Sequence, residues 1–346
     1  MAVIRHGSLR SCASAHPYAW CVTPKIELHI HLEGSIRPPT LLAIARRNGE
    51  KLPVETVEDL AKLYEFSDFA HFIDVWILTT NCLRTREDFR QVALEYAAEA
   101  AGFGAVYVEG IFSPCERVAR GVDWDDIFGG YTDAIAEAQE RFGLTLRLTP
   151  DLYRSVDVDV AEQAARTAVR YADSGVVGLG LGGMEAGLPA APYRRAFEIA
   201  RDGGLGIVPH SGEAAGADSM REILAMDPDR IRHGIRAVDD PDLLAEIAER
   251  GLVLDVCPTS NVRTGCVPSL ADHPLPALRA AGVRCTINTD DPAMFGTDLS
   301  VEHEAAAGLG VSAADAFEAG LAGALCGDVT RARLAEIGQA AFTSSR

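Results

Sequence analysis

The chain has 346 residues, and 48 % of them are hydrophobic, so it can bury a large core. Its 50 acidic residues outnumber its 32 basic ones and give a formal net charge of −18. Such a charge opposes binding to a nucleic-acid backbone or to an anionic membrane, and it favours a small-molecule ligand. No apolar stretch approaches the roughly 20 residues that a membrane-spanning helix needs.

The N-terminal 23 residues differ from the rest of the chain. They include two histidines and two cysteines but lack the continuous apolar core of a signal peptide. We expect residues 1–23 to be a disordered extension or the product of a start codon assigned too early, rather than a metal-binding tail. Residues 24–342 are expected to form a single domain. The eight cysteines form no Cys-x-x-Cys pairs, which predicts free thiols and a cytoplasmic protein.

Eight short apolar runs rich in β-branched residues recur along the chain, with helical segments between them. The predicted strands cover residues 26–31, 105–112, 144–149, 176–181, 205–210, 230–233, 252–257 and 283–288. Five glycines stand between a predicted helix and the next strand, where helices commonly end: Gly143, Gly175, Gly204, Gly251 and Gly282. This repetition predicts a parallel sheet that closes into a (β/α)8 TIM barrel.

A long helical insertion is predicted between the first two strands, at about residues 38–102. Its apolar side chains are expected to pack against the barrel mouth and cover the site, or to pack beside the barrel. They are Phe66, Phe69, Phe72, Trp76 and Leu78.

Polar clusters follow the first, fifth, sixth and eighth predicted strands, at the end of a barrel where active sites form. His29 and His31 lie two residues apart in a strand, so their imidazoles point the same way. A single buried histidine is more often a hydrogen-bonded core residue, but His210 and Asp290 complete a ligand set that suits one zinc ion. Considered without the histidines, Asp290 and Asp291 could instead form a helix cap or a turn.

The zinc ion would lower the pKa of a bound water toward ~7. Glu213 follows His210 on the same loop and is predicted to act as general acid. His233 could orient the nucleophile or shuttle its proton, and Asp291 could accept a hydrogen bond from the substrate. Residues 176–183 contain no lysine or carboxylate that could bridge a second metal, so we expect a mononuclear site. The glycines of that strand indicate close approach to a flat ligand or, alternatively, barrel packing.

Five segments resemble the adenosine and AMP deaminase family of the amidohydrolase superfamily: residues 24–35, 210–213, 232–234, 257–261 and 288–292. The resemblance implies a zinc-dependent barrel that replaces an aromatic amino group by oxygen. It makes His29, His31, His210 and Asp290 the metal ligands. It also implies that Glu213 protonates the ring nitrogen next to the attacked carbon and that His233 positions the hydroxide. By the same resemblance, Asp291 contacts the imidazole-ring nitrogen and the Gly183 backbone contacts the remaining pyrimidine nitrogen.

The chain departs from this family on the sugar side of the expected pocket. Glu33 stands where adenosine deaminases have an aspartate that contacts the 5′-hydroxyl, and Gly180 and Met184 replace acidic residues. Glu33 lies two residues past His31, so its side chain is expected on the same strand face. We therefore predict hydrolytic deamination of an adenosine-like 6-aminopurine nucleoside, with adenosine handled poorly relative to a purine whose 5′-hydroxyl group is altered or missing. Aminodeoxyfutalosine or adenine is the alternative substrate. Another mononuclear amidohydrolase reaction or a non-catalytic binding role is more remote. The oligomeric state does not follow from the sequence.

Overall fold

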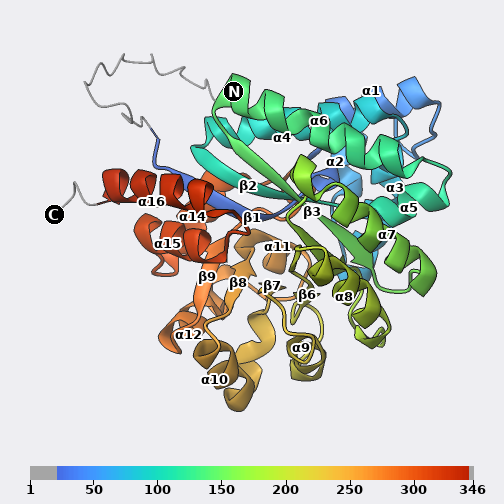
Figure 1. Cartoon of the computed structure of the whole chain (residues 1–346). Helices are drawn as coiled ribbons and strands as arrows, with labels where there is room; N and C mark the ends of the chain where they lie inside the picture. The colour runs from blue at the N-terminus through green and yellow to red at the C-terminus, as the bar shows by residue number, and fades with distance from the viewer. Residues whose placement is uncertain (1–21, 343–346) are drawn as a thin grey trace, which may run out of the picture.

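The computed structural model describes residues 22–342, which form a closed barrel of parallel strands surrounded by helices (Figure 1). The strands are β1 (Lys25–His31), β2 (Ala105–Phe112), β3 (Thr145–Tyr153), β4 (Gly178–Gly182), β5 (Gly206–Ile207), β6 (His210–Ser211), β7 (Arg230–His233), β8 (Val253–Val256) and β9 (Arg284–Ile287). The predicted (β/α)8 TIM barrel is confirmed. Almost all of the predicted N-terminal extension lies outside the described residues.

The predicted fifth strand is divided into β5, which pairs with β4, and β6, which pairs with β7. Between them, the Val208 N–H donates to Leu179 on one side, and the Pro209 carbonyl accepts from Arg232 on the other. Proline has no N–H, so the regular ladder stops there. The barrel closes where the His31 N–H donates to the Asp290 carbonyl at 2.8 Å and the Asp290 N–H donates to the His29 carbonyl at 3.1 Å.

Helices follow most strands and form the outer layer. They are α1 (Pro38–Asn48), α2 (Val57–Leu63), α3 (Phe69–Thr80), α4 (Arg86–Gly102), α5 (Pro114–Ala119), α6 (Trp124–Phe142), α7 (Val158–Arg170), α8 (Arg194–Asp202), α9 (Ala217–Leu224), α10 (Pro241–Glu249), α11 (Pro258–Arg263), α12 (Leu275–Ala280), α13 (Pro292–Phe295), α14 (Leu299–Gly308), α15 (Ala313–Gly323) and α16 (Asp328–Phe342). All five glycines expected at helix ends have positive φ, from 65° at Gly251 to 109° at Gly175.

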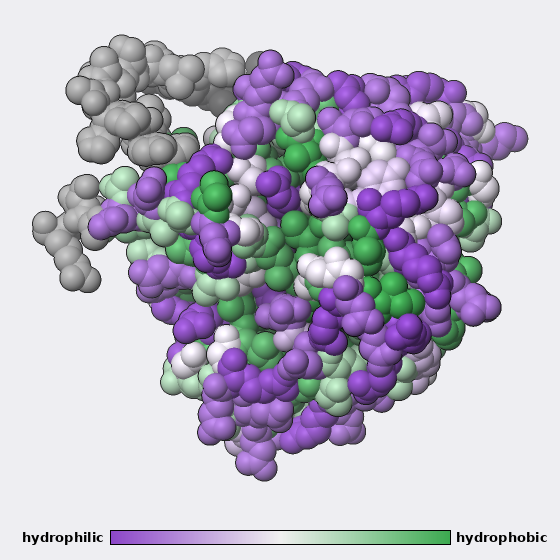
Figure 2. Space-filling model, viewed as in Figure 1, coloured by the Kyte–Doolittle hydropathy of each residue, from purple (hydrophilic) through white to green (hydrophobic). Residues whose placement is uncertain are grey.

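The surface that surrounds this barrel is largely hydrophilic in the view of Figure 2, with hydrophobic residues showing mainly near the centre. Within residues 22–342, no helix is both long enough and apolar enough to cross a membrane.

The insertion between β1 and β2 forms helices α1 to α4, as predicted. The rings of Phe66 and Phe72 lie 6.0 and 5.0 Å from the ring of Phe295 in α13, so this part of the insertion packs over the barrel mouth. Helix α4 instead packs beside the barrel, where Phe89 contacts Tyr131 of α6. Both alternatives are therefore realised by different helices. The prediction was wrong for Leu78, which is 43 % exposed because it lies on the outer face of α3.

The glycines of β4 serve barrel packing more than ligand approach. A Cβ atom at Gly180 would overlap the carboxylate of Asp151 and the guanidinium of Arg232, which form a buried ion pair across the barrel. A Cβ at Gly178 would lie 2.8 Å from Leu325 Cδ1. Close approach to a ligand remains open only for Gly182 and Gly183, which line the cavity described below.

We expect Gly180→Ala to destabilise the fold by about 2–4 kcal/mol, because overpacking and disruption of a buried ion pair are both costly. Urea unfolding measures this difference. Gly308→Ala is the matched control, since a Cβ at that helical position meets nothing within 4 Å. Equal stability of the two variants would show that Gly180 is not required for packing.

Candidate active site

The four candidate metal ligands converge at the carboxyl end of the barrel. His29 and His31 extend from β1, His210 from β6, and Asp290 follows β9. The Nε2 atom of His210 lies 3.1 Å from Nε2 of both His29 and His31. Oδ1 of Asp290 lies 3.4 Å from the same two Nε2 atoms. The structure thus brings together residues from distant parts of the sequence around one point.

This donor set fits a divalent cation. Burial lowers the pKa of His31 to about 4 and that of His29 well below its usual value, so both imidazoles are neutral. Nδ1 of His210 lies 3.2 Å from the Leu181 carbonyl, to which it can donate a hydrogen bond, leaving Nε2 with a free lone pair. Three imidazoles beside a carboxylate form the nitrogen and oxygen ligand set that zinc binds.

Asp290 is held in place by its backbone and by a neighbouring helix. Its φ of 64° is unusual for a residue other than glycine, and such strain concentrates at functional sites. The Ser260 hydroxyl, from α11, donates to Oδ2 of Asp290 at 2.6 Å. Although burial opposes ionisation, the nearby imidazoles of His29, His233 and His31 keep the pKa of Asp290 well below its usual range. The carboxylate is therefore anionic and oriented.

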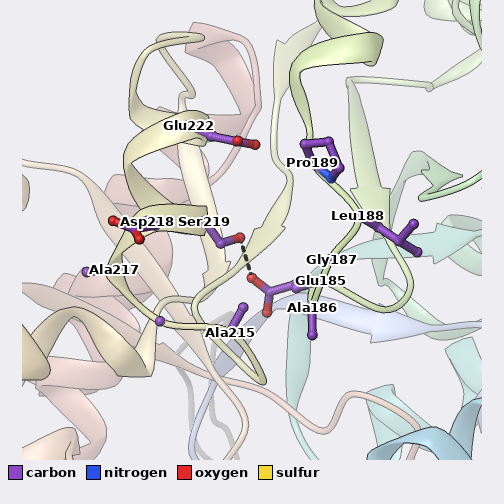
Figure 3. A pocket seen from close by; sticks show the side chains of 11 residues that line it. Glu185, Ala186, Gly187, Leu188, Pro189, Ala215, Ala217, Asp218, Ser219 and Glu222 are labelled. Atoms are coloured by element: carbon purple, nitrogen blue, oxygen red, sulfur yellow. Dashed lines mark hydrogen bonds between the residues drawn. The ribbon is translucent and has the colours of Figure 1, made fainter.

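Glu213 lies on the loop after β6, and a second carboxylate fixes that loop. Glu185 accepts hydrogen bonds from the backbone N–H groups of Gly212, Glu213 and Ala214 at 2.8, 2.9 and 3.1 Å. Figure 3 shows Glu185 from a neighbouring hollow, where the Ser219 hydroxyl also donates to it at 2.7 Å. Sequence reasoning assigned Glu185 no role, because its partners become neighbours only in the fold.

The Glu213 carboxyl group is suited to carry a proton. Burial, together with the nearby carboxylates of Asp290 and Glu185, raises the pKa of Glu213 well above its usual value. Its Oε2 atom lies 3.4 Å from Nε2 of His233, at the end of β7. Burial lowers the pKa of His233 to about 3, so this imidazole is neutral. The pair combines a carboxyl group whose surroundings favour its protonated form with an uncharged histidine.

Asp291 is tied to the helix that covers the barrel mouth. Its Oδ1 atom accepts a hydrogen bond from Nε1 of Trp76, in α3, at 2.8 Å. Asp291 precedes α13, but its side chain makes no capping hydrogen bond, so the helix-cap alternative is not realised. Burial and the charge of Asp290 raise the pKa of Asp291 well above its usual value. Trp76 was predicted only as an apolar cover, because its indole N–H has no recognisable sequence signal.

Glu33 does not lie where strand alternation would place it. Strand β1 ends at His31, and Glu33 begins a short 3-10 turn. Its buried Oε1 atom accepts from the Ser113 N–H at 2.9 Å and lies 3.8 Å from the Arg117 guanidinium. Ser113 lines the cavity and Glu33 does not. The expectation that Glu33 shares a strand face with His31 is therefore corrected.

The candidate site opens into a cavity of about 290 Å³. This volume is close to the lower end of the usual range for small-molecule pockets. One end is polar and contains His31, His210, Glu213, His233, Asp290 and Asp291. Gly183 also lines it, with a φ of 83° that favours glycine. The remaining wall includes a group of apolar side chains, Phe69, Phe72, Ile73, Trp76, Ile77, Leu152, Tyr153, Met184 and Leu188, and a smaller polar group, Ser113, Glu116, Asp151, Arg154 and Ser155.

Comparison with known proteins identifies the family. A model of the adenosine deaminase family matches residues 24–336. The chain belongs to this family. It is 54 % identical over 325 residues to an aminodeoxyfutalosine deaminase from Acidothermus cellulolyticus, an alignment that covers 92 % of this chain and 91 % of the relative. It is thus a hydrolase that acts on carbon–nitrogen bonds of cyclic amidines.

Solved structures of this family share the fold. An adenine deaminase from Arthrobacter aurescens superposes with a TM-score of 0.87 at 32 % identity, covering 92 % of this chain and 98 % of that one. An amidohydrolase from Burkholderia ambifaria with bound Zn superposes with a TM-score of 0.83 at 26 % identity, covering 93 % and 91 %. This deaminase therefore belongs to a metal-dependent family.

Proposed function

We propose that the protein is a zinc-dependent deaminase that hydrolyses aminodeoxyfutalosine to the corresponding 6-oxopurine nucleoside and ammonia. The observation that carries this proposal is the cavity, which combines the polar cluster of a deaminase with a wall on which apolar side chains are in the majority. The 54 % identical relative named for this activity supports the choice of substrate.

One zinc ion per chain would be held by His29, His31, His210 and Asp290. When bound, it would activate a water molecule as a nucleophile at neutral pH. The absence of a lysine or carboxylate from β4 (Gly178–Gly182) supports a mononuclear site. The zinc found in the Burkholderia ambifaria structure fits this choice of metal.

The protein's own groups would handle the purine ring and its protons. Glu213, with its raised pKa, donates a proton to the ring nitrogen next to the attacked carbon. Asp291 receives a hydrogen bond from Trp76 on Oδ1, so its protonated carboxyl group can donate from the other oxygen to the acceptor nitrogen of the imidazole ring. This reverses the direction expected from the sequence, which made Asp291 an acceptor. The Gly183 N–H contacts the remaining pyrimidine nitrogen.

The apolar wall favours a nucleoside with a modified 5′ position over adenosine. Glu33 does not line the cavity, and its carboxylate accepts a hydrogen bond from the Ser113 N–H. The apolar side chain of Met184 does line the cavity. A 5′-hydroxyl buried against the apolar side chains of this wall would lose hydrogen bonds to water without replacement, which costs about 1–3 kcal/mol. Free adenine would leave this wall without a partner. Adenine remains the second candidate, because the Arthrobacter aurescens structure is that of an adenine deaminase.

The proposal extends to the setting of the enzyme. We propose that residues 24–342 act as one catalytic domain on a small purine substrate, in the cytoplasm and without a nucleic-acid or membrane partner. The free state of Cys82, Cys115, Cys257, Cys266, Cys285 and Cys326 is compatible with a reducing compartment.

The test of substrate choice is kcat/KM for ammonia release from aminodeoxyfutalosine, adenine, adenosine and deoxyadenosine. We expect aminodeoxyfutalosine to exceed the others by about 10²-fold or more. Met184→Asp should lower kcat/KM for aminodeoxyfutalosine more than kcat/KM for adenosine. Glu33→Asp is the matched change at a residue that does not line the cavity. A preference for adenine or adenosine would contradict the proposed substrate while leaving deamination intact.

A further inference from the structure

A chain of buried hydrogen bonds reaches His233 from the side opposite the cavity. The backbone N–H of Leu275 lies 3.1 Å from Nδ1 of His273. Nε2 of His273 lies 3.2 Å from Oδ1 of Asn261, and Nδ2 of Asn261 lies 3.2 Å from Nδ1 of His233. All three side chains are buried, so water does not compete for these contacts. The chain runs from the start of α12 through α11 to the end of β7.

The backbone N–H at one end fixes the proton positions along this chain. An amide N–H can only donate, so Nδ1 of His273 must accept, and the ring proton of His273 sits on Nε2. That N–H donates to Asn261, which must therefore turn its carbonyl oxygen toward His273. The amide NH₂ of Asn261 then faces His233 and donates to Nδ1, so the proton of His233 sits on Nε2.

We propose that Asn261 and His273 are positioning residues that lock His233 in the Nε2–H tautomer, so that His233 presents a hydrogen-bond donor to the reacting centre. The Nε2–H group lies 3.4 Å from Oε2 of Glu213 and 3.7 Å from Oδ2 of Asp290, at the polar end of the cavity. The description of the reacting centre rests on the proposed deaminase function. The hydrogen-bond chain itself does not.

The fixed tautomer distinguishes the two roles that the sequence left open for His233, which are to orient the nucleophile or to shuttle its proton. A histidine whose Nε2 already carries a proton cannot take another proton there while Nδ1 accepts from Asn261. In the resting enzyme, His233 therefore holds the attacking water through a donated hydrogen bond and is not the base that deprotonates it. A fixed histidine tautomer can have a large effect on kcat in other enzymes. In a serine-protease triad, the wrong histidine tautomer lowers kcat by about 10⁴-fold.

Asn261→Asp reverses this polarity with little change in shape. A carboxylate accepts from both neighbours, so His233 must donate from Nδ1 and present a bare Nε2 lone pair to the cavity. His273→Phe removes the anchor and leaves Asn261 free to turn. Thr264→Val is the matched control, because Thr264 lies directly after α11 and its hydroxyl donates to the Ser260 carbonyl, outside the chain that reaches His233.

The test is ¹⁵N NMR of zinc-loaded, histidine-labelled protein, with the His233 signals assigned by their loss in His233→Gln. We expect the wild type and Thr264→Val to show a proton on Nε2 of His233, and Asn261→Asp to show it on Nδ1. In the same samples, kcat of Asn261→Asp should fall by about 10²-fold or more while zinc content and KM stay close to wild type.

An Nδ1–H tautomer in the wild type would overturn the proposal, and this measurement needs only the His233→Gln variant, for the assignment. An unchanged Nε2–H tautomer in folded Asn261→Asp would also overturn it. Failure of the wild type to release ammonia from any 6-aminopurine would contradict the proposed function, but the tautomer would still be read from the same spectra. The two failures are therefore distinguishable.

Discussion

Replacing Glu213 by glutamine is expected to lower kcat by at least 10²–10⁴-fold, the range that general acid catalysis supplies. The amide keeps the shape of the side chain but has no acidic proton. The loop should stay in place, because Glu185 holds it through the backbone N–H groups of residues 212–214 and not through the Glu213 side chain. Single-turnover ammonia release from metal-replete protein measures the effect.

Glu222→Gln is the matched control for this variant. Glu222 belongs to the neighbouring hollow of Figure 3, where its Oε2 atom accepts from the Ala190 N–H at 2.9 Å, and it does not line the cavity. The control should keep its turnover. Turnover near the wild-type level in zinc-loaded Glu213→Gln would remove Glu213 from the role of proton donor.

Removal of the metal is expected to abolish turnover and to lower the melting temperature. The Nε2 atom of His210 lies 3.1 Å from the Nε2 atoms of His29 and His31, so a cation bound among them would give the three nitrogen lone pairs one shared partner. Bound zinc stabilises the native state by about 2.7 kcal/mol when its free concentration is 100 times its Kd. Dialysis against a chelator, followed by titration with zinc, should restore activity at one equivalent per chain.

Ser260→Ala refines this test, because it leaves all four candidate ligands and removes only the 2.6 Å hydrogen bond to Asp290. Loss of such a supporting bond typically weakens metal affinity by about 10–100-fold. A requirement for two equivalents of zinc would contradict the mononuclear site. Activity that survives complete metal removal would contradict metal dependence itself.

The barrel was predictable because its signals are local and repeated. Apolar runs alternated with helical segments, and the glycines at helix ends, such as Gly143 and Gly251, adopt the left-handed backbone that glycine allows. The convergence of His29 with His31 followed from strand alternation, and their meeting with His210 and Asp290 followed from the shared carboxyl end of the strands.

The features that sequence reasoning missed depend on contacts between distant segments. The sequence prediction put Glu33 on the same face as His31 by extending β1 two residues too far. The 3-10 turn that begins at Glu33 instead directs its carboxylate to the Ser113 N–H. Gly180 reads as a ligand-facing glycine until Asp151 and Arg232 are seen to fill its space. Asn261 lay within a segment that resembles the family, yet its role follows from His273 and Leu275, which only the fold brings beside it.

The most direct test of hydrolytic deamination is the fate of oxygen and nitrogen during turnover. Zinc-loaded protein should be incubated with aminodeoxyfutalosine in water enriched in ¹⁸O, and the products analysed by mass spectrometry. We predict one ¹⁸O atom in the purine ring of an intact nucleoside and one molecule of ammonia for each molecule converted. Release of a free purine base would contradict the account. Recovery of all four 6-aminopurines of the substrate panel unchanged would also contradict it.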